Sequence, residues 1–289
     1  HPHETAQDVT KAENLTKWIS EWVDPSKVKV ERSAVYQFHG LVAKKWRVGR
    51  AMIIGDAAHQ MPPFMGQGLC AGARDAANLA WKIAAVSRGE APLEFLDTVE
   101  QERSPHVKAV TKGAIEMGKV VCVLDEDEAA ARDRKMMEDH KAGRGFAFPS
   151  VPYIENGVLS DATAGHVFPE PFTGSIDTPV RVDDEVGIVP LLVLKDTENL
   201  SVADRSAIAA LQLASPNLKI VTLGGEIPES IKALDADGHV AHLMDNAPAM
   251  LVKPDRIIFG SAAVPVLALA WRNYLQGEDV LVQEKEIAA

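Results

Sequence analysis

The sequence has 289 residues, a formal net charge of −11, a hydrophobic fraction of 46% and a mean hydropathy of −0.05. This length fits one large domain or two ordinary ones, and the composition is typical of a globular protein in water. The acidic balance disfavours nucleic acids and anionic membranes as partners, and no apolar run approaches the ~20 residues of a membrane span. Because the first residues are polar and the two cysteines and nine histidines form no metal-ligand spacing, we expect no signal peptide, no metal site and a cytoplasmic protein.

The first 47 residues predict a helix followed by strand material. Residues 14–23 carry apolar side chains at helical spacing, and Asp24-Pro25 ends that helix. Residues 28–42 alternate apolar and polar side chains, which predicts a strand. Aromatic residues in strands lie mostly in the core, yet a place near an aromatic substrate is also open, and Tyr36 is the best candidate for it.

Residues 50–82 are the most informative part of the chain. The apolar residues 52–54 predict a buried strand, and Gly55 ends it where the backbone passes close to another group. Asp56 then stands at the carboxyl end of a strand, where ligands dock in open α/β sheets. Pro62-Pro63 stiffens the following turn, and Gly66-Gln67-Gly68 opens an alanine-rich helix over residues 73–87. The free N–H groups at this helix start favour negative charge.

Other polar residues of this stretch are interpreted as structural. His59 titrates near neutrality and could act as a base, but its neighbours favour a histidine that braces the turn. Asp75 and Asn78 are expected to pack and cap rather than to react.

Residues 93–118 continue as helix, with a helix junction at residues 100–106, and the acidic run 125–128 predicts a solvated helix start. The segment 143–180 is rich in glycine and proline and is interpreted as a linker.

The last third predicts a separate α/β unit. Its expected elements are strands over 189–194 and 218–223 around a helix over 201–213, then a hairpin over 249–260 and a helix over 264–275. This unit contains no cysteine, which excludes thiol–disulfide chemistry there.

Two parts of the sequence together resemble the single-component flavoprotein aromatic hydroxylases, which share the fold of p-hydroxybenzoate hydroxylase. The order strand, Gly-Asp, Ala-Ala-His, Pro-Pro, Gly-Gln-Gly and Asn-Leu-Ala-Trp-Lys across residues 50–82 is similar to their second FAD-binding motif. The β-α-β then β-β-α order and the run from Leu251 to Gly260 resemble the thioredoxin-like C-terminal domain of the 3-(3-hydroxyphenyl)propionate, resorcinol and phenol hydroxylase branch.

The resemblance implies an α/β (α+β) fold, with the C-terminal part of a FAD-binding Rossmann-like domain, the end of the substrate-domain sheet and a thioredoxin-like domain without CxxC. The implied divisions are 1–47 for the end of the substrate-binding domain and 48–142 for the FAD-binding part with its helices, then 143–180 for the linker and 181–289 for the thioredoxin-like domain. The Gly-rich GxGxxG motif is absent from the sequence, so we expect the chain to require an N-terminal half that carries it.

The resemblance also implies a reaction and its residues. NADH or NADPH reduces FAD, and a flavin hydroperoxide transfers one oxygen atom to a small phenol similar to 3-hydroxyphenylpropionate or resorcinol, in a protein that is a homodimer. Asp56 would hold the ribityl chain, Tyr36 would lie at the substrate, and the catalytic residues stay unassigned. The residues implied at the cofactor are Gly55, Asp56, Pro63, Gly66, Gln67, Gly68 and Leu69.

Two alternatives stay open. The chain could be a non-catalytic C-terminal fragment that dimerises through the thioredoxin-like domain and binds no flavin. It could also belong to a related flavoprotein oxygenase, such as an epoxidase or a halogenase-like enzyme, although such proteins generally lack the thioredoxin-like domain.

Overall fold

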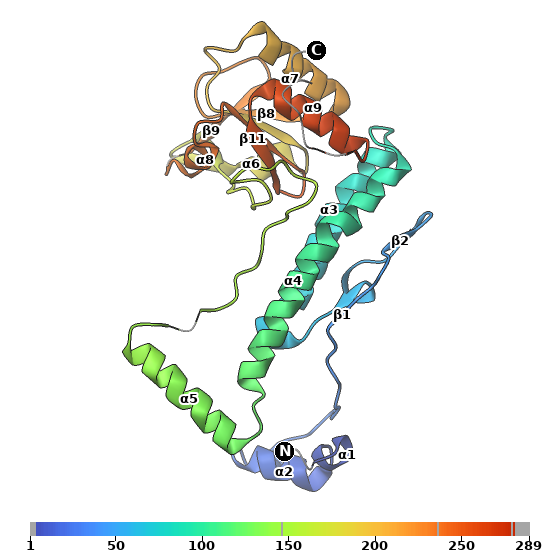
Figure 1. The fold of residues 1–289 in the computed structure, drawn as a ribbon, viewed down its shortest axis with the longest axis vertical. Helices are drawn as coiled ribbons and strands as arrows, with labels where there is room; N and C mark the ends of the chain where they lie inside the picture. Colours follow the sequence, from blue (N-terminus) through green and yellow to red (C-terminus); the bar gives the residue numbers. More distant parts are fainter. Residues whose placement is uncertain (1–3, 146, 236, 279, 281–289) are drawn as a thin grey trace. The chain divides into compact units, whose positions relative to one another are not determined.

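The computed structural model describes residues 4–145, 147–235, 237–278 and 280 (Figure 1). The chain divides into two compact units. The first contains residues 1–41, 60–66 and 111–150, and the second contains residues 42–59, 67–110 and 151–289.

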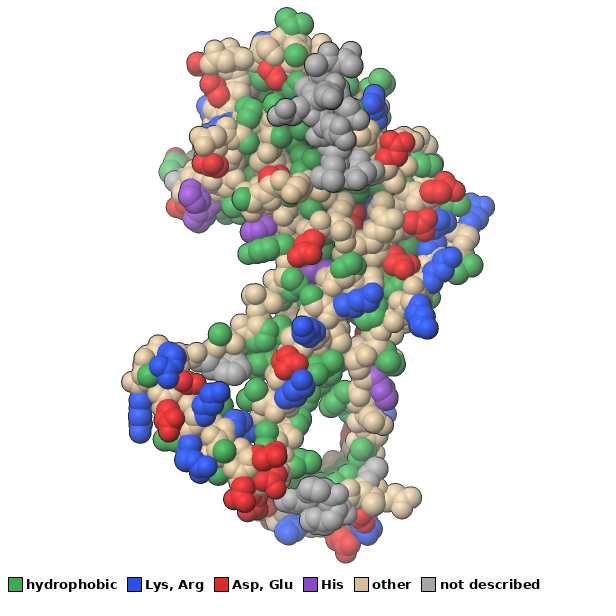
Figure 2. Space-filling view, viewed as in Figure 1, with side chains coloured by type: hydrophobic (Ala, Val, Ile, Leu, Met, Phe, Trp, Pro, Cys, Tyr) green, Lys and Arg blue, Asp and Glu red, His purple; other side chains and the backbone are tan. Residues whose placement is uncertain are grey.

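Short helices and one long charged helix make up most of the first unit. Helices α1 (Ala6–Val9) and α2 (Ala12–Ser20) precede the 3-10 turn η1 (Pro25–Lys27), and the 3-10 turn η3 (Pro63–Met65) lies in the middle segment. The expected N-terminal helix is present as α2, but none of its residues is buried among the described residues. Helix α5 (Glu126–Lys141) begins at Asp125, whose carboxylate accepts hydrogen bonds from two backbone N–H groups. None of its residues is buried, which confirms the solvated helix start expected at residues 125–128, and Figure 2 shows acidic and basic side chains on this helix.

The strand expected over residues 28–42 is largely wrong. Only β1 (Leu41–Val42) has strand geometry, and it pairs with β4 (His59–Gln60). Alternating apolar and polar side chains give a segment one apolar face, but a strand also needs a neighbouring strand for its backbone hydrogen bonds. Among the described residues, no strand pairs with residues 28–40.

The second unit begins with a small hairpin, one long helix and the first part of another, whose residues from 111 onward belong to the first unit. The hairpin joins β2 (Arg47–Val48) to β3 (Ala51–Met52), and the 3-10 turn η2 (Gly55–Ala57) follows. Ile53 is 38% exposed, so the buried strand expected over residues 52–54 is wrong, because β3 has a strand partner on one side only among the described residues.

Helices α3 (Gly68–Ser87) and α4 (Asp97–Val121) run alongside each other, with the 3-10 turn η4 (Leu93–Leu96) between them in the chain (Figure 1). The helix expected over residues 73–87 is confirmed, with an earlier start at Gly68. The helix junction expected at residues 100–106 is wrong, because α4 is one continuous helix of 25 residues that includes Pro105. Asn156 explains this continuity, since its side chain donates a 3.0 Å hydrogen bond to the Gln101 carbonyl, the acceptor that Pro105 cannot serve.

A seven-stranded mixed sheet forms the rest of the second unit, in the order β11-β10-β7-β8-β9-β5-β6. Strands β7 (Leu191–Leu194), β8 (Lys219–Thr222) and β9 (Ser230–Leu234) are parallel, whereas β10 (Ala249–Val252) is antiparallel to both β7 and β11 (Ile258–Ala262). The antiparallel pair β5 (Phe172–Ser175) and β6 (Thr178–Arg181) extends the β9 side of the sheet. The segment interpreted as a linker therefore contains β5 and most of β6.

Helices cover both faces of this sheet. Residues 192 and 194 of β7 pack with α7 (Val202–Ala214) and α9 (Val264–Leu275), and Trp81 of α3 joins that core. Residues 191 and 193 face the opposite way, onto α6 (Val182–Val186) and α8 (His239–Met244). This alternation is what a strand buried on both faces requires. The expected β-α-β and β-β-α units are present as β7-α7-β8 and β10-β11-α9, with the unexpected β9 and α8 between them.

Candidate functional site: the Gly55–Asp56 turn and the start of helix α3

Asp56 lies in a tight turn that is held against helix α3. Gly55 has φ +56°, a left-handed conformation that side-chain-bearing residues rarely adopt. The backbones also come close, since a Cβ built on Gly72 of α3 would lie 3.5 Å from the Gly55 Cα atom. The Asp56 side chain is exposed and makes no hydrogen bond within the described part of the chain, so its carboxylate is free to accept donors from a ligand.

A buried carboxylate beneath the turn fixes its position. Asp75 of α3 accepts a hydrogen bond of 3.0 Å from the Gly55 N–H and lies 2.6 Å from Nε2 of His59. Its other oxygen accepts from Nε of Arg103 at 2.8 Å. Burial alone would raise the pKa of Asp75, but the hydrogen bonds from His59 and Arg103 lower it below the usual value. His59 and Asp75 are both at most 2% exposed, so they support the turn from inside, as expected.

The start of α3 is open to a flat ligand. Gly66 has φ +62° and closes the preceding 3-10 turn, and a Cβ at Gly66 or Gly68 would meet no atom within 4 Å. The helix begins at Gly68 without a side-chain cap, and Leu69 is 87% exposed. Uncapped N–H groups at the positive end of a 20-residue helix present hydrogen-bond donors to any partly negative group placed there.

The other expected site residues are placed as follows. Gln67 precedes the helix, and its Oε1 accepts hydrogen bonds from both terminal nitrogens of Arg74 at 3.1 and 3.2 Å. Pro63 begins η3 and is exposed. Tyr36 is 74% exposed and meets Phe38 edge-on at 5.1 Å, so it does not lie in the core.

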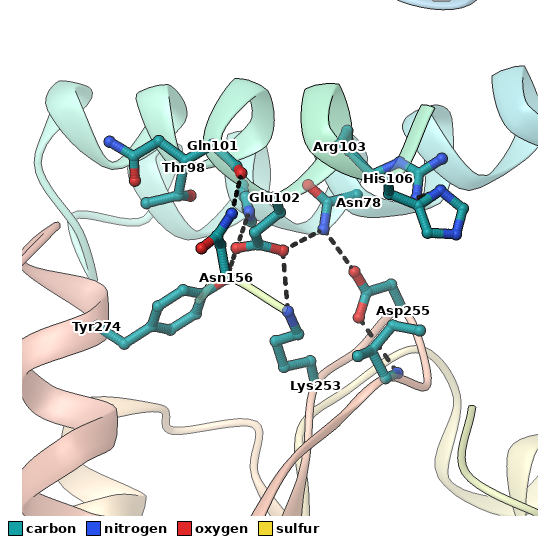
Figure 3. A network of polar contacts seen from close by, with 12 residues as sticks. Asn78, Thr98, Gln101, Glu102, Arg103, His106, Asn156, Lys253, Asp255 and Tyr274 are labelled. Atoms are coloured by element: carbon teal, nitrogen blue, oxygen red, sulfur yellow. Dashed lines mark hydrogen bonds and ion pairs between the residues drawn. The ribbon is translucent and has the colours of Figure 1, made fainter. Parts of the chain in front are cut away.

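Sequence reasoning missed a buried polar cluster behind the site. The Glu102 carboxylate accepts hydrogen bonds from Lys82 at 2.7 Å, Tyr274 at 2.6 Å, Lys253 at 2.9 Å and Asn78 at 2.8 Å. Figure 3 shows Asn78, Lys253 and Tyr274 around Glu102. Burial would raise the pKa of Glu102, but the two lysine charges bring it down to about 2. Burial lowers the pKa of Lys82 to about 8 in spite of the Glu102 charge. Because Lys253 directly follows β10 and Tyr274 lies on α9, this cluster ties α3 and α4 to the sheet of the second unit.

The comparisons with known proteins agree with this geometry. Residues 1–114 match the FAD binding domain family. A probable NADH-specific resorcinol 4-hydroxylase of Rhodococcus jostii is 32% identical over 260 residues, which cover 89% of this chain and 48% of that protein. A 3-(3-hydroxy-phenyl)propionate/3-hydroxycinnamic acid hydroxylase of Mycolicibacterium gilvum is 34% identical over 82% of this chain and 41% of its own length. This chain is related to the FAD-dependent aromatic hydroxylases.

Solved structures of aromatic hydroxylases have a fold similar to that of this chain. Aklavinone-11 hydroxylase, in a complex with FAD and aklavinone, aligns with a TM-score of 0.64 at 21% identity over 96% of this chain and 53% of that one. The flavin-dependent monooxygenase PieE, in complex with FAD and substrate, aligns with a TM-score of 0.67 at 19% identity over 95% of this chain and 55% of its own. The chain spans about half the length of the curated relatives and solved structures that it matches.

Two features of this chain fit a bound FAD. The exposed Asp56 carboxylate has no partner among the described residues. The first turn of α3 is uncapped, and the space beside Gly66 and Gly68 is open, because a Cβ there would meet no atom within 4 Å. A hydroxyl-rich chain and a partly negative ring edge are the complements of these two features.

The described residues contain neither a candidate metal-binding cluster nor a helix that could span a membrane. No group of three or more histidine, cysteine, aspartate or glutamate side chains there could hold a metal ion. None of the described helices is both long enough and apolar enough to cross a lipid bilayer.

Proposed function

We propose that this chain forms the second FAD-binding motif and the C-terminal domain of an aromatic hydroxylase that acts on a small phenol. Resorcinol and 3-(3-hydroxyphenyl)propionate are the substrates in the names of the relatives, so a phenol with a substituent in the meta position is the preferred substrate. NADH is favoured over NADPH as reductant, since one relative is named as NADH-specific. Bound FAD would supply the redox chemistry that delivers one oxygen atom of O₂ to the ring.

The observation that supports this proposal best is the braced but free carboxylate of Asp56. A side chain that binds a cofactor must be held in place while its acceptor atoms stay unused. Asp75 fixes the Gly55 backbone next to it, and the Asp56 carboxylate stays exposed and unpaired among the described residues. Asp56 would accept hydrogen bonds from the hydroxyls of the ribityl chain. The backbone N–H groups of Gly68 and Leu69 would stabilise negative charge on the edge of the ring system.

The remaining proposed contacts are local to the same segment and to Tyr36. Pro63, Gly66 and Gln67 would shape the loop along the flavin, because proline fixes the backbone and glycine lets it approach a flat ring. Tyr36 would contact the phenol through its exposed ring. No side chain of this chain is assigned as an acid or a base.

The test is the affinity of the protein for FAD, measured by quenching of flavin fluorescence. An Asp56→Ala variant should bind FAD about tenfold to a hundredfold more weakly, because hydrogen bonds to a charged group contribute about 1.5–3 kcal/mol. Asp127→Ala, an exposed aspartate in the first turn of α5, is the matched control and should leave the affinity unchanged. Wild-type affinity in Asp56→Ala would contradict the assignment of Asp56.

The proposal includes a requirement for an N-terminal half with a GxGxxG motif to bind the pyrophosphate of FAD. The length of the relatives, about twice that of this chain, favours this requirement and also keeps a second candidate open. In that candidate the chain alone is a non-catalytic fragment that binds no flavin. An intact-mass spectrum of the denatured protein purified from its source decides between them. A heavier chain, or a second component with the motif, supports the hydroxylase, and a single species of 31.2 kDa without flavin absorbance supports the fragment.

We also propose that the sheet of the second unit is thioredoxin-like and forms the contact of a homodimer in the cytoplasm. Its β-α-β and β-β-α units support this classification. Light scattering of the purified protein should give twice the mass of one chain. The mass of a single chain would contradict the dimer.

A further inference from the structure

A cleft of about 410 Å³ opens between helices α3 and α4, the segment 151–154, the segment 165–167 and the β10–β11 turn. All of its lining residues belong to the second unit. The volume lies in the range of small-molecule sites, which is roughly 300–1,000 Å³. None of the residues proposed to contact FAD or the phenol lines this cleft.

Two arginines give the cleft its charge. Arg74 of α3 donates only to the neutral Gln67 side chain, and no carboxylate lies within 4.0 Å of it in the described residues. Arg103 of α4 is paired with Asp75 through Nε, and its Nη1 donates to His106. With Asp255 as the acid in the lining, the formal charge of the lining is +1 when the histidines are counted as neutral.

Buried polar atoms in the same wall lack partners. Arg103 is 2% exposed, and its Nη2 has no acceptor among the described residues. Asn78 is 3% exposed, and its Oδ1 has no donor there, although its amide nitrogen serves both Glu102 and Asp255. Figure 3 shows Asn78, Arg103 and His106 side by side on α3 and α4, with Asp255 opposite. A buried guanidinium nitrogen without an acceptor is costly, and an anion in the cleft would relieve that cost.

Aromatic rings form the opposite wall. Tyr153 and His166 stack with their ring centroids 3.5 Å apart and their planes 12° from parallel. Tyr153 is 58% exposed, so part of its surface stays available to a ligand. Rings of this kind pack favourably against another flat ring, which contributes about 0.5–1.5 kcal/mol beyond the buried area.

We propose that this cleft binds a planar aromatic ring that carries an anionic group, with the anion at Arg74 and Arg103 and the ring against Tyr153 and His166. An aromatic carboxylate and a nucleotide monophosphate share this chemistry. Arginine suits both, because its planar fork matches the oxygens of carboxylate and phosphate. This second site shares no lining residue with the proposed flavin site, although Arg74 donates to Gln67 beside that site.

Isothermal titration of the chain without FAD tests the inference with three probes: benzoate, AMP and cyclohexanecarboxylate. We expect one benzoate or one AMP to bind per chain, and the tighter of the two identifies the source of the ligand. Cyclohexanecarboxylate, which has the charge but no aromatic ring, should bind about twofold to tenfold more weakly than benzoate.

Variants locate the binding. Arg74→Gln should weaken binding of the preferred probe at least about tenfold, as expected for a lost charge-assisted hydrogen bond. Tyr153→Ala should weaken it several-fold. Tyr153 is exposed and Arg74 is half-buried, so we expect both variants to keep the fold, which circular dichroism checks. The matched control is Arg181→Gln, an exposed arginine outside the cleft, which should bind like the wild type. The inference is overturned if neither benzoate nor AMP binds in the millimolar range, or if Arg74→Gln binds the preferred probe as tightly as the wild type.

Discussion

The side chain of Asn156 donates a 3.0 Å hydrogen bond to the backbone carbonyl of Gln101, four residues before Pro105 in helix α4. In a regular helix that carbonyl accepts from the N–H of residue 105, which a proline lacks. Asn156 comes from a segment 55 residues further along the chain, so a distant side chain replaces a local backbone donor. The helix can therefore continue through the proline.

This replacement predicts a coupling between Asn156 and Pro105. Asn156→Ala should destabilise the protein by about 1 kcal/mol, the usual net contribution of one hydrogen bond. In a Pro105→Ala background the alanine N–H can serve the Gln101 carbonyl, so the same change should cost clearly less. Urea denaturation of the four proteins gives the coupling energy. An equal cost in both backgrounds would show that the two residues act independently.

The Glu102 cluster predicts a large loss of stability on removal of one charge. Glu102→Gln leaves Lys82 and Lys253 buried without their shared counter-ion, and both lysines are 0% exposed. Breaking a buried pair in this way costs about 3–5 kcal/mol. Glu116→Gln is the matched control on the same helix, because Glu116 pairs with Lys119 at the surface and should change the free energy of unfolding by less than about 1 kcal/mol. A small effect at Glu102, measured by urea denaturation, would contradict the assigned role of the cluster.

The backbone of the Gly55–Asp56 turn predicts a difference between neighbouring glycines. Gly55→Ala should destabilise the protein by about 1–2 kcal/mol, because φ is +56° there although space for a Cβ exists. Gly55→Asn should cost less, since asparagine tolerates the left-handed region better. Gly68→Ala is the control, because Gly68 begins α3 with ordinary φ and open space around it. Thermal unfolding of the three variants compares them, and equal losses at Gly55 and Gly68 would show that φ is not the cause.

The elements of the second unit that could be predicted from the sequence are those with a continuous run or stripe of buried apolar residues. Strands β7, β8, β10 and β11 and helices α7 and α9 lie close to their expected residues, because each has a run or stripe of buried apolar side chains. Strand β9 was missed because only Ala233 in it is fully buried, and α8 was missed because it has six residues. Residues 28–42 show the opposite error, since their alternation is real but no described strand pairs with most of them.

In the candidate site, too, local features could be predicted from the sequence and long-range contacts could not. The left-handed backbone at Gly55 and Gly66 could be predicted, because it follows from the local conformational freedom of glycine. The Glu102 cluster could not, since its partners Lys82, Lys253 and Tyr274 lie 20, 151 and 172 residues away in the chain. No local pattern records such a convergence, and Glu102 alone resembles any other glutamate on a helix.

The last prediction concerns His106, whose protonation should weaken the fold. Burial lowers the pKa of His106 to about 4 from 6.5, and the charges of Arg103 and Arg74 add to this. Nδ1 of His106 faces the donor Nη1 of Arg103, so it must accept, and Nε2 donates to the Pro152 carbonyl at 3.1 Å. The neutral ring therefore fits this place and the protonated ring does not.

The sign of the pH dependence follows from linkage. The folded pKa of His106 lies below the unfolded value, so between pH 6.5 and 4 the unfolded chain binds more protons. The stabilisation from the neutral ring is complete above 6.5 and is lost as the pH falls through that window. In His106→Gln the glutamine oxygen can accept from Arg103 and its amide can donate to Pro152, so this variant should lose less stability than the wild type over the same range. His140→Gln, an exposed histidine on α5, should follow the wild type. Denaturant titrations at several pH values measure the difference, and parallel curves for the wild type and His106→Gln would mean that His106 is not the group that titrates.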